Sequence, residues 1–256
     1  MVQTQWRHPP LTQAESDDLF MLMLEDDTED APWMVMGDLQ FWSASGFAHS
    51  LRNYAHELGL GWYVASMLPI EYVWPDSPRK RQLSPDAFVA FAPEHTRSSY
   101  DLEVEGNFPP FVLEVVSPSS TGRDQLEKRK AYDLLQAREY ALFTPREGAP
   151  SSLAGHRRNA AGEFEPWPPD DQGRLWSEVL GLYLIVQGRL LQAQTPEGRL
   201  LLTPEQAEVA RRQAEDAQRR AEDAQRRAED ARRRADDEAE RLRRELERYR
   251  REGGGS

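Results

Sequence analysis

The chain has 256 residues, no cysteine and a formal net charge of −12 at pH 7, a length sufficient for one well-packed domain with an extension. Without cysteine it can form neither disulfides nor thiolate metal sites. No apolar run approaches the roughly 20 residues of a membrane span, and the N-terminus lacks the basic and then apolar order of a signal peptide, so we expect a cytoplasmic protein.

The charge is unevenly distributed along the chain. Residues 205–252 contain 15 acidic residues and 15 arginines, which leaves 29 of the 44 acids and 17 of the 32 basic residues for the first 204 positions. The N-terminal part is therefore acidic, and the C-terminal stretch is neutral. Because phosphate contacts come from clustered Lys and Arg, this distribution argues against tight nonspecific DNA binding, although not against DNA cleavage.

The N-terminal third begins with an acidic, proline-bearing segment, 1–32, that we expect to be partly mobile, with FMLML at 20–24 as a candidate short helix. The next segment, 41–58, has apolar residues at helical spacing, and Gly59 supplies a stop. It is therefore predicted to be a helix that precedes the sheet. Its apolar positions are Phe41, Trp42, Phe47, Leu51, Tyr54 and Leu58.

Two short strands are predicted next, at 62–67 and 70–74, followed by a polar loop at 75–83. Glu71 lies on the second strand in an apolar setting. This acid could be an additional metal ligand or a surface acid on an edge strand.

One carboxylate interrupts an otherwise apolar run. The stretch FVLEVV at 111–116 is typical of a buried strand apart from Glu114. An ionised carboxylate there costs several kcal/mol unless it is paired or binds a metal. A second acid, Asp86, follows Pro85 and opens the apolar run 87–91, at the start of a neighbouring strand. Two acids on adjacent strands can share one cation, or each can be a strand-end acid in an ion pair.

A turn cluster at 117–122 separates this strand from a predicted helix at 124–136, whose apolar side contains Leu126, Ala131, Leu134 and Leu135. A helix that packs back on the sheet brings its first turns near the strand that feeds it. Lys128, one turn into the helix, can then reach the Glu114 region. Two acids followed by such a lysine suggest metal-dependent phosphodiester hydrolysis.

The residues of this helix also have simpler interpretations. Lys128 could be a solvated lysine like Lys130, although only three lysines occur beside 29 arginines and two of them are on this helix. Asp124 is suited to cap the helix N-terminus. Tyr132 is suited to packing in the core.

The segment LSPDAFVAF, at 83–91, and the segment YDLEVEGNFPPFVLEVVSPSSTGRDQLEKRKAYDLLQAREYALFTP, at 100–145, carry a family resemblance. They resemble the Uma-two group of bacterial restriction endonucleases, a branch of the PD-(D/E)XK nuclease superfamily, and the resemblance extends over about residues 40–204. The group has Pro-Asp on one strand, Glu-Val-x-Ser on the next, and Asp, Lys and Tyr on the following helix. The matching positions here are Asp86, Glu114, Asp124, Lys128 and Tyr132.

The chain departs from the superfamily pattern at three places. The usual lysine two residues after the strand acid is Val116, so the basic role falls to Lys128. After the helix the resembled group has Gly-Val, then Glu-Tyr-Trp and then Asp-Pro. Here Ala137-Arg138 replaces the Gly-Val, Ala141 replaces the Trp, and Thr144-Pro145 replaces the Asp-Pro. The last two changes concern edge packing more than chemistry.

The resemblance implies an α/β fold over 33–202, a restriction-endonuclease-like mixed sheet flanked by helices. It also implies a Mg²⁺-dependent DNA endonuclease, with Mn²⁺ as a substitute metal. The implied metal ligands are the carboxylates of Asp86 and Glu114 and the carbonyl of Val115, with Glu71 and Asp124 as additional candidates, and Lys128 would act on the attacking water. The DNA-binding candidates are Arg123, Arg129 and Lys130.

Beyond this helix, 138–144 is predicted to be the next strand, and turn-bounded segments follow at 153–158, 163–167 and 173–194. The last of these divides at Gly188 into two strands. In the resembled group this region is a small antiparallel extension of the core.

From Thr203 the composition changes to a seven-residue repeat, AEDAQRR, with alanines stepping three and four. This pattern predicts a charged helical rod over 203–252, about 70 Å long, with a flexible Gly/Ser end at 253–256. An all-alanine seam buries little area. Any coiled coil is therefore weak before the larger residues Leu242, Leu246 and Tyr249. A homodimer could form through these residues or through the core domain. The alternative function is a non-catalytic interaction protein that uses this rod on a nuclease-like scaffold.

Overall fold

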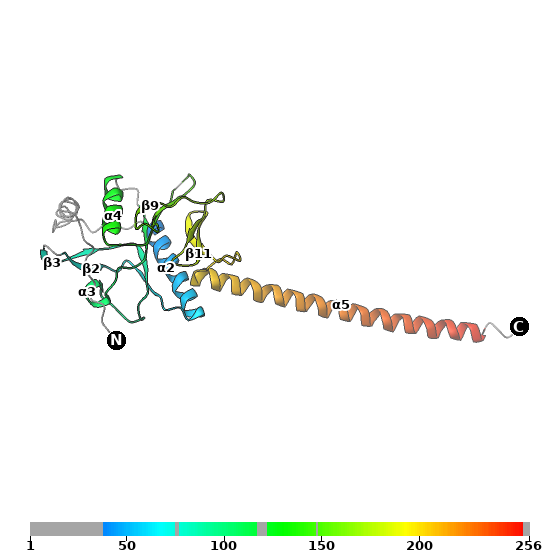
Figure 1. Ribbon diagram of the computed structural model, residues 1–256. Helices are drawn as coiled ribbons and strands as arrows, with labels where there is room; N and C mark the ends of the chain where they lie inside the picture. The colour runs from blue at the N-terminus through cyan, green and yellow to red at the C-terminus, as the bar shows by residue number, and fades with distance from the viewer. Residues whose placement is uncertain (1–37, 75–76, 117–121, 147, 253–256) are drawn as a thin grey trace. The chain divides into compact units, whose positions relative to one another are not determined.

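The computed structural model describes residues 38–74, 77–116, 122–146 and 148–252. The chain divides into two compact units, Met1–Thr203 and Pro204–Ser256. The first unit is a mixed α/β domain and the second is a single long helix (Figure 1). None of the described helices is long and apolar enough to cross a membrane.

A six-stranded mixed sheet forms the centre of the first unit, with strand order β1-β4-β6-β7-β8-β9. Only β6 and β7 are parallel to each other among these neighbours. Parallel neighbours need a crossover connection, and helix α4 (Gly122–Leu134) lies between them in the chain. The strands are β1 (Tyr63–Ser66), β4 (Ala87–Ala90), β6 (Phe111–Val115), β7 (Glu139–Thr144), β8 (Ser152–Arg158) and β9 (Phe164–Pro166).

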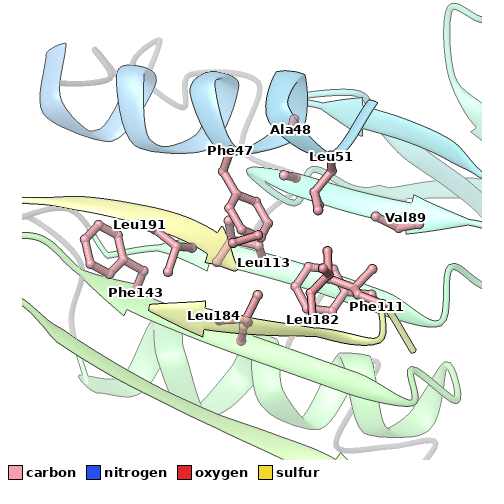
Figure 2. Close-up of a cluster of buried hydrophobic side chains, with 14 of the residues drawn as sticks. Phe47, Ala48, Leu51, Val89, Phe111, Leu113, Phe143, Leu182, Leu184 and Leu191 are labelled. Atoms are coloured by element: carbon pink, nitrogen blue, oxygen red, sulfur yellow. The ribbon is translucent and has the colours of Figure 1, made fainter. Parts of the chain in front are cut away.

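One face of this sheet packs against helix α2 (Asp38–Leu58) and a three-stranded antiparallel sheet of β10 (Leu175–Ser177), β11 (Leu182–Gln187) and β12 (Leu190–Gln194). Figure 2 shows Phe47 and Leu51 of α2 pointing toward the main sheet, whose Leu113 on β6 belongs to the same core. Alternate residues of each strand face this side, as the two-residue period of a strand requires. The predicted helix at 41–58 is thus confirmed, with its start three residues earlier.

The other face packs against α4 and a smaller sheet of order β3-β2-β5. Its strands are β2 (Ile70–Trp74), β3 (Ser77–Leu83) and β5 (Tyr100–Asp101), and a short helix, α3 (Leu102–Glu105), follows β5. Val112 of β6, Tyr140 of β7 and Tyr132 of α4 are fully or almost fully buried in this second core.

Three expectations need correction. The segment expected as a polar loop at 75–83 contains β3, which pairs with β2 at the edge of its sheet. An edge strand tolerates polar residues and proline because one side needs no partner strand. The segment 173–194 forms three strands rather than two, because Leu175–Ser177 pairs with β11. Leu126 is 46% exposed, so it is not part of the buried side of α4.

The second unit is helix α5 (Pro204–Glu252), as the heptad pattern predicts. From Val209 to Arg248 every side chain is exposed. The helix carries several ion pairs between its own turns, including Arg211 with Glu208 and Glu215. The predictions for 1–32, for the turn at 117–121 and for 253–256 lie outside the described residues.

Candidate active site

Asp86 and Glu114 lie on the same face of the main sheet. The antiparallel register of β4 and β6 ends with Ala87 opposite Leu113, so the next residues along the two strands are Asp86 and Glu114. Residues opposite each other on antiparallel strands have neighbouring side chains. Both acids are buried, at 6% and 4% exposure, and both have the strand parity of residues that face α4.

Glu114 is held by two side chains of α4. Lys128 Nζ lies 3.0 Å from Glu114 Oε2, and the Tyr132 hydroxyl donates to Oε1 at 2.5 Å. Lys128 and Tyr132 are four residues apart, so they lie on one side of the helix. The Lys128 side chain remains one-third exposed. It therefore contacts both the buried Glu114 carboxylate and the solvent.

Asp86 is held mainly by backbone. Its Oδ2 accepts a hydrogen bond from the Val115 amide at 2.6 Å, and its Oδ1 lies 3.5 Å from Nε2 of Gln40 at the start of α2. A residue that faces the neighbouring antiparallel strand directs both its N–H and its C=O toward that strand. The Val115 carbonyl is therefore directed to the same edge of β6 as the Asp86 carboxyl group.

Burial is the largest influence on the protonation of both acids. Burial and, to a smaller extent, the neighbouring Asp86 raise the pKa of Glu114 to about 7 against the lowering effect of Lys128. Burial also raises the pKa of Asp86, which the Val115 amide and Lys128 partly counteract. Two adjacent carboxyl groups with one nearby ammonium group thus retain protons at a pH where exposed carboxyl groups are ionised.

A comparison with protein families identifies the family of the chain. The family model described as Uma2, putative restriction endonuclease, matches residues 32–194. The chain belongs to the Uma2 family. No curated protein matches the chain. The matched range contains the main sheet, α4 and all four side chains of the site: Asp86, Glu114, Lys128 and Tyr132.

The structure does not bring every predicted residue of this Uma2 protein to the site. Glu71 lies on the smaller sheet, where Lys80 Nζ is 3.3 Å from Glu71 and 2.6 Å from Asp101. Within the described part of the chain, no group of three acidic, histidine or cysteine residues could hold a metal ion. The Asp86–Glu114 pair thus offers two carboxylates, and the Val115 carbonyl is the further ligand that the resemblance implies.

The predicted DNA-binding residues lie on α4, but only two of their side chains are described. Lys130 is exposed, and Arg129 is half-buried, with Nη1 3.4 Å from Nε2 of His156. The side chains of Arg123 and Asp124 lie outside the described ones. Arg129 and Lys130 thus differ in their surroundings although they are adjacent.

Tyr132, which matches a helix position of the family and which the sequence suggests for core packing, also contacts the site. It is fully buried, but its hydroxyl also orients the Glu114 carboxylate. The signal was present in the spacing of Lys128 and Tyr132, since residues four apart share one side of a helix. Gln40 was missed for another reason: it reaches Asp86 from 46 residues away in the chain.

Proposed function

We propose that this Uma2 protein is a metal-dependent DNA endonuclease that hydrolyses phosphodiester bonds. The proposal is carried by one observation: two buried acids lie opposite each other on adjacent strands, and a lysine contacts one of them. The family supports nuclease activity in general. The metal, the DNA substrate and the roles of individual residues are our proposal.

The residues present fit a Mg²⁺ ion. Mg²⁺ is usually bound through one or two carboxylates and retains several waters, and this site offers two carboxylates and the Val115 carbonyl. Burial raises the pKa of both Asp86 and Glu114 although Lys128 lowers them, so a bound cation would favour the ionised forms of the pair. When bound, Mg²⁺ would polarise the scissile phosphate and lower the pKa of a water molecule.

The side chains of the site would supply the other functions that the reaction requires. Glu114 would provide one carboxylate oxygen to the metal, and the Tyr132 hydroxyl would keep that carboxylate in its rotamer. Lys128 would donate a hydrogen bond to the attacking water or to a phosphate oxygen, because its ammonium group is already at the carboxylate and is partly exposed. Lys130 and Arg129 would contact the DNA backbone beside the site.

Calorimetry with Mn²⁺ tests the metal site separately from catalysis. We expect binding by the full-length protein that disappears in Asp86→Ala and in Glu114→Ala. Glu71→Ala is the matched control, since Glu71 is an acid on a neighbouring sheet that contacts Lys80 instead. Unchanged Mn²⁺ binding in both site variants would refute the metal site. Binding without Mg²⁺-dependent cleavage of any DNA would instead favour the non-catalytic interaction protein.

A further inference from the structure

The apolar seam of α5 changes its register near the C-terminal end. Upstream, the seam consists of alanines spaced alternately three and four residues apart, as far as Ala235. Two consecutive steps of four residues then occur, from Ala231 to Ala235 and from Ala235 to Ala239. The seam continues through Leu242 and Leu246. An insertion of this kind rotates the seam around the helix. The last part of α5 therefore presents a different face from the alanine repeat.

This terminal seam, defined by Ala235, Ala239, Leu242 and Leu246, is uncovered in the single chain. Leu242 is 54% exposed and Leu246 is 53% exposed. They are the only large aliphatic residues of α5 besides Val209. The seam has the spacing of the a and d positions of a coiled coil, with Ala239 and Leu246 at a and Leu242 at d.

The charges at the edges of the terminal seam are complementary to a second copy. In a parallel two-stranded coiled coil, position g of one helix faces position e of the next heptad on the other. Here Glu238 occupies g and Arg243 occupies the following e, so two parallel copies would place Glu238 beside Arg243 in both directions. An antiparallel pair would place like positions together. Among the described residues, neither side chain has an ion-pair partner on its own helix.

The alanine repeat has no such complementarity. Its corresponding edge pairs are Arg220 with Gln225 and Arg227 with Arg232, so a second parallel copy would gain no opposite charges there. Alanine also buries little apolar area compared with leucine. Both charge and apolar area therefore favour self-pairing at the terminal seam over the repeat.

We propose that residues 235–248 of α5 are the site at which two copies of this chain pair in parallel. The register of the pair is set by Glu238 and Arg243, and the leucines provide the apolar contact. The alanine repeat upstream contributes little to the pairing. This inference is independent of the proposed nuclease activity, because it uses no residue of the first unit.

Cysteine cross-linking tests both place and direction, because the chain contains no cysteine. Ala239→Cys in the full-length protein, oxidised without DNA or metal, should give a disulfide-linked dimer as the main product on a non-reducing gel. Ala214→Cys, at the equivalent position of the repeat, is the control and should give roughly fivefold less dimer, since a disulfide requires close Cα atoms. Equal cross-linking at both positions, or none at Ala239→Cys, would overturn the proposal.

Charge exchange tests the register. Glu238→Arg alone and Arg243→Glu alone should each weaken dimerisation about tenfold in sedimentation equilibrium, because the symmetry of the dimer counts each pair twice. The double exchange should restore the wild-type value. Glu247→Arg makes the same charge change on the outer face and should have no effect. A double exchange no tighter than the single variants, or equal weakening by Glu247→Arg, would refute the assigned pairing.

Discussion

Two buried glutamates on neighbouring parallel strands have different surroundings in this protein. Glu114 of β6 lies on the face of the main sheet that packs against α4. Glu139, the first residue of β7, lies on the opposite face, where β10 packs. Their exposures are 4% and 3%. Burial raises the pKa of both carboxyl groups. Burial and a shifted pKa therefore do not distinguish a reactive carboxylate from a structural one.

The partners of the two carboxylates do distinguish them. Glu139 accepts hydrogen bonds from the Ser177 hydroxyl and from the amides of Glu178 and Val179, at 2.6 Å and 3.1 Å for the amides. These hydrogen bonds connect the Glu139 carboxylate to the end of β10 and the turn that follows it. Glu114 has a second acid, Asp86, opposite it and a partly exposed lysine on one oxygen. A carboxylate whose partners are all fixed donors stabilises a fold, whereas one beside another acid can take up a cation.

The largest expected effect separates the two residues by activity. Glu114→Gln should lower the rate of the proposed Mg²⁺-dependent DNA cleavage roughly a thousandfold, because it removes a proposed metal ligand. Glu139→Gln keeps the size of the side chain and should change the rate less than about threefold. Single-turnover cleavage of a plasmid measures both. Comparable losses in the two variants would mean that Glu139 is as important for cleavage as Glu114.

The lysine of the site gives the next largest effect. Lys128→Ala should abolish cleavage while leaving the melting temperature within a few degrees, because Glu114, whose pKa is raised to about 7 mainly by burial, can bind a proton once the ammonium group is removed. Lys130→Ala, on the same helix, should weaken DNA binding at most and keep the cleavage rate at saturating DNA, because Lys130 is proposed to contact only the DNA backbone. The two positions point about 200° apart, at about 100° per residue, so only one faces the sheet. Loss of activity in Lys130→Ala alone would reassign the role.

Substitution should destabilise the fold more at Glu139 than at Glu114, the reverse of the expected effects on activity. Glu139→Ala leaves a buried hydroxyl and two backbone amides without their acceptor and should lower the free energy of unfolding by about 3 kcal/mol. Glu114→Ala in the metal-free protein should cost less, because it also removes the repulsion with Asp86. Urea denaturation with EDTA present measures both. A larger loss in Glu114→Ala would make Glu114 the structural residue.

The pH dependence of stability offers a finer test of Glu114. Its pKa rises from an ordinary value of 4.5 to about 7 in the folded protein, so the folded state binds this proton more tightly than the unfolded state. Its contribution to stability is complete below pH 4.5 and is lost as the pH rises to about 7. Glu114→Gln should therefore gain about 2 kcal/mol relative to the wild type between pH 5 and pH 8.

That comparison is made without metal, with melting followed at several pH values. Glu247→Gln, at an exposed position of α5, is the control and should keep a constant difference from the wild type. Mg²⁺ should reduce the effect in the wild type because a bound cation favours the ionised pair. A constant difference for Glu114→Gln would mean that Glu114 does not titrate in this range.

Much of the site was predictable from the sequence, because Glu114 is an acid within an apolar run. Its strand, the neighbouring strand after Asp86 and the helix with Lys128 all occur where the residue patterns predict them. Glu139 gave no comparable signal, since it follows Arg138 at the start of its strand. Its partner Ser177 is 38 residues away in the chain and on β10, a strand that the patterns did not separate.

The smallest expected effect concerns the rod. Deleting residues 205–256 should leave a folded first unit in which both glutamates behave as before, because the chain divides at Thr203 and the side chains from Val209 to Arg248 are exposed. Mn²⁺ affinity should stay within about twofold and the melting temperature within a few degrees. Calorimetry and thermal melting of the truncated protein measure these quantities. A truncated protein that is insoluble, or that loses Mn²⁺ binding, would mean that the rod supports the nuclease-like fold. The difference between the two carboxylates would then not be a property of the first unit alone.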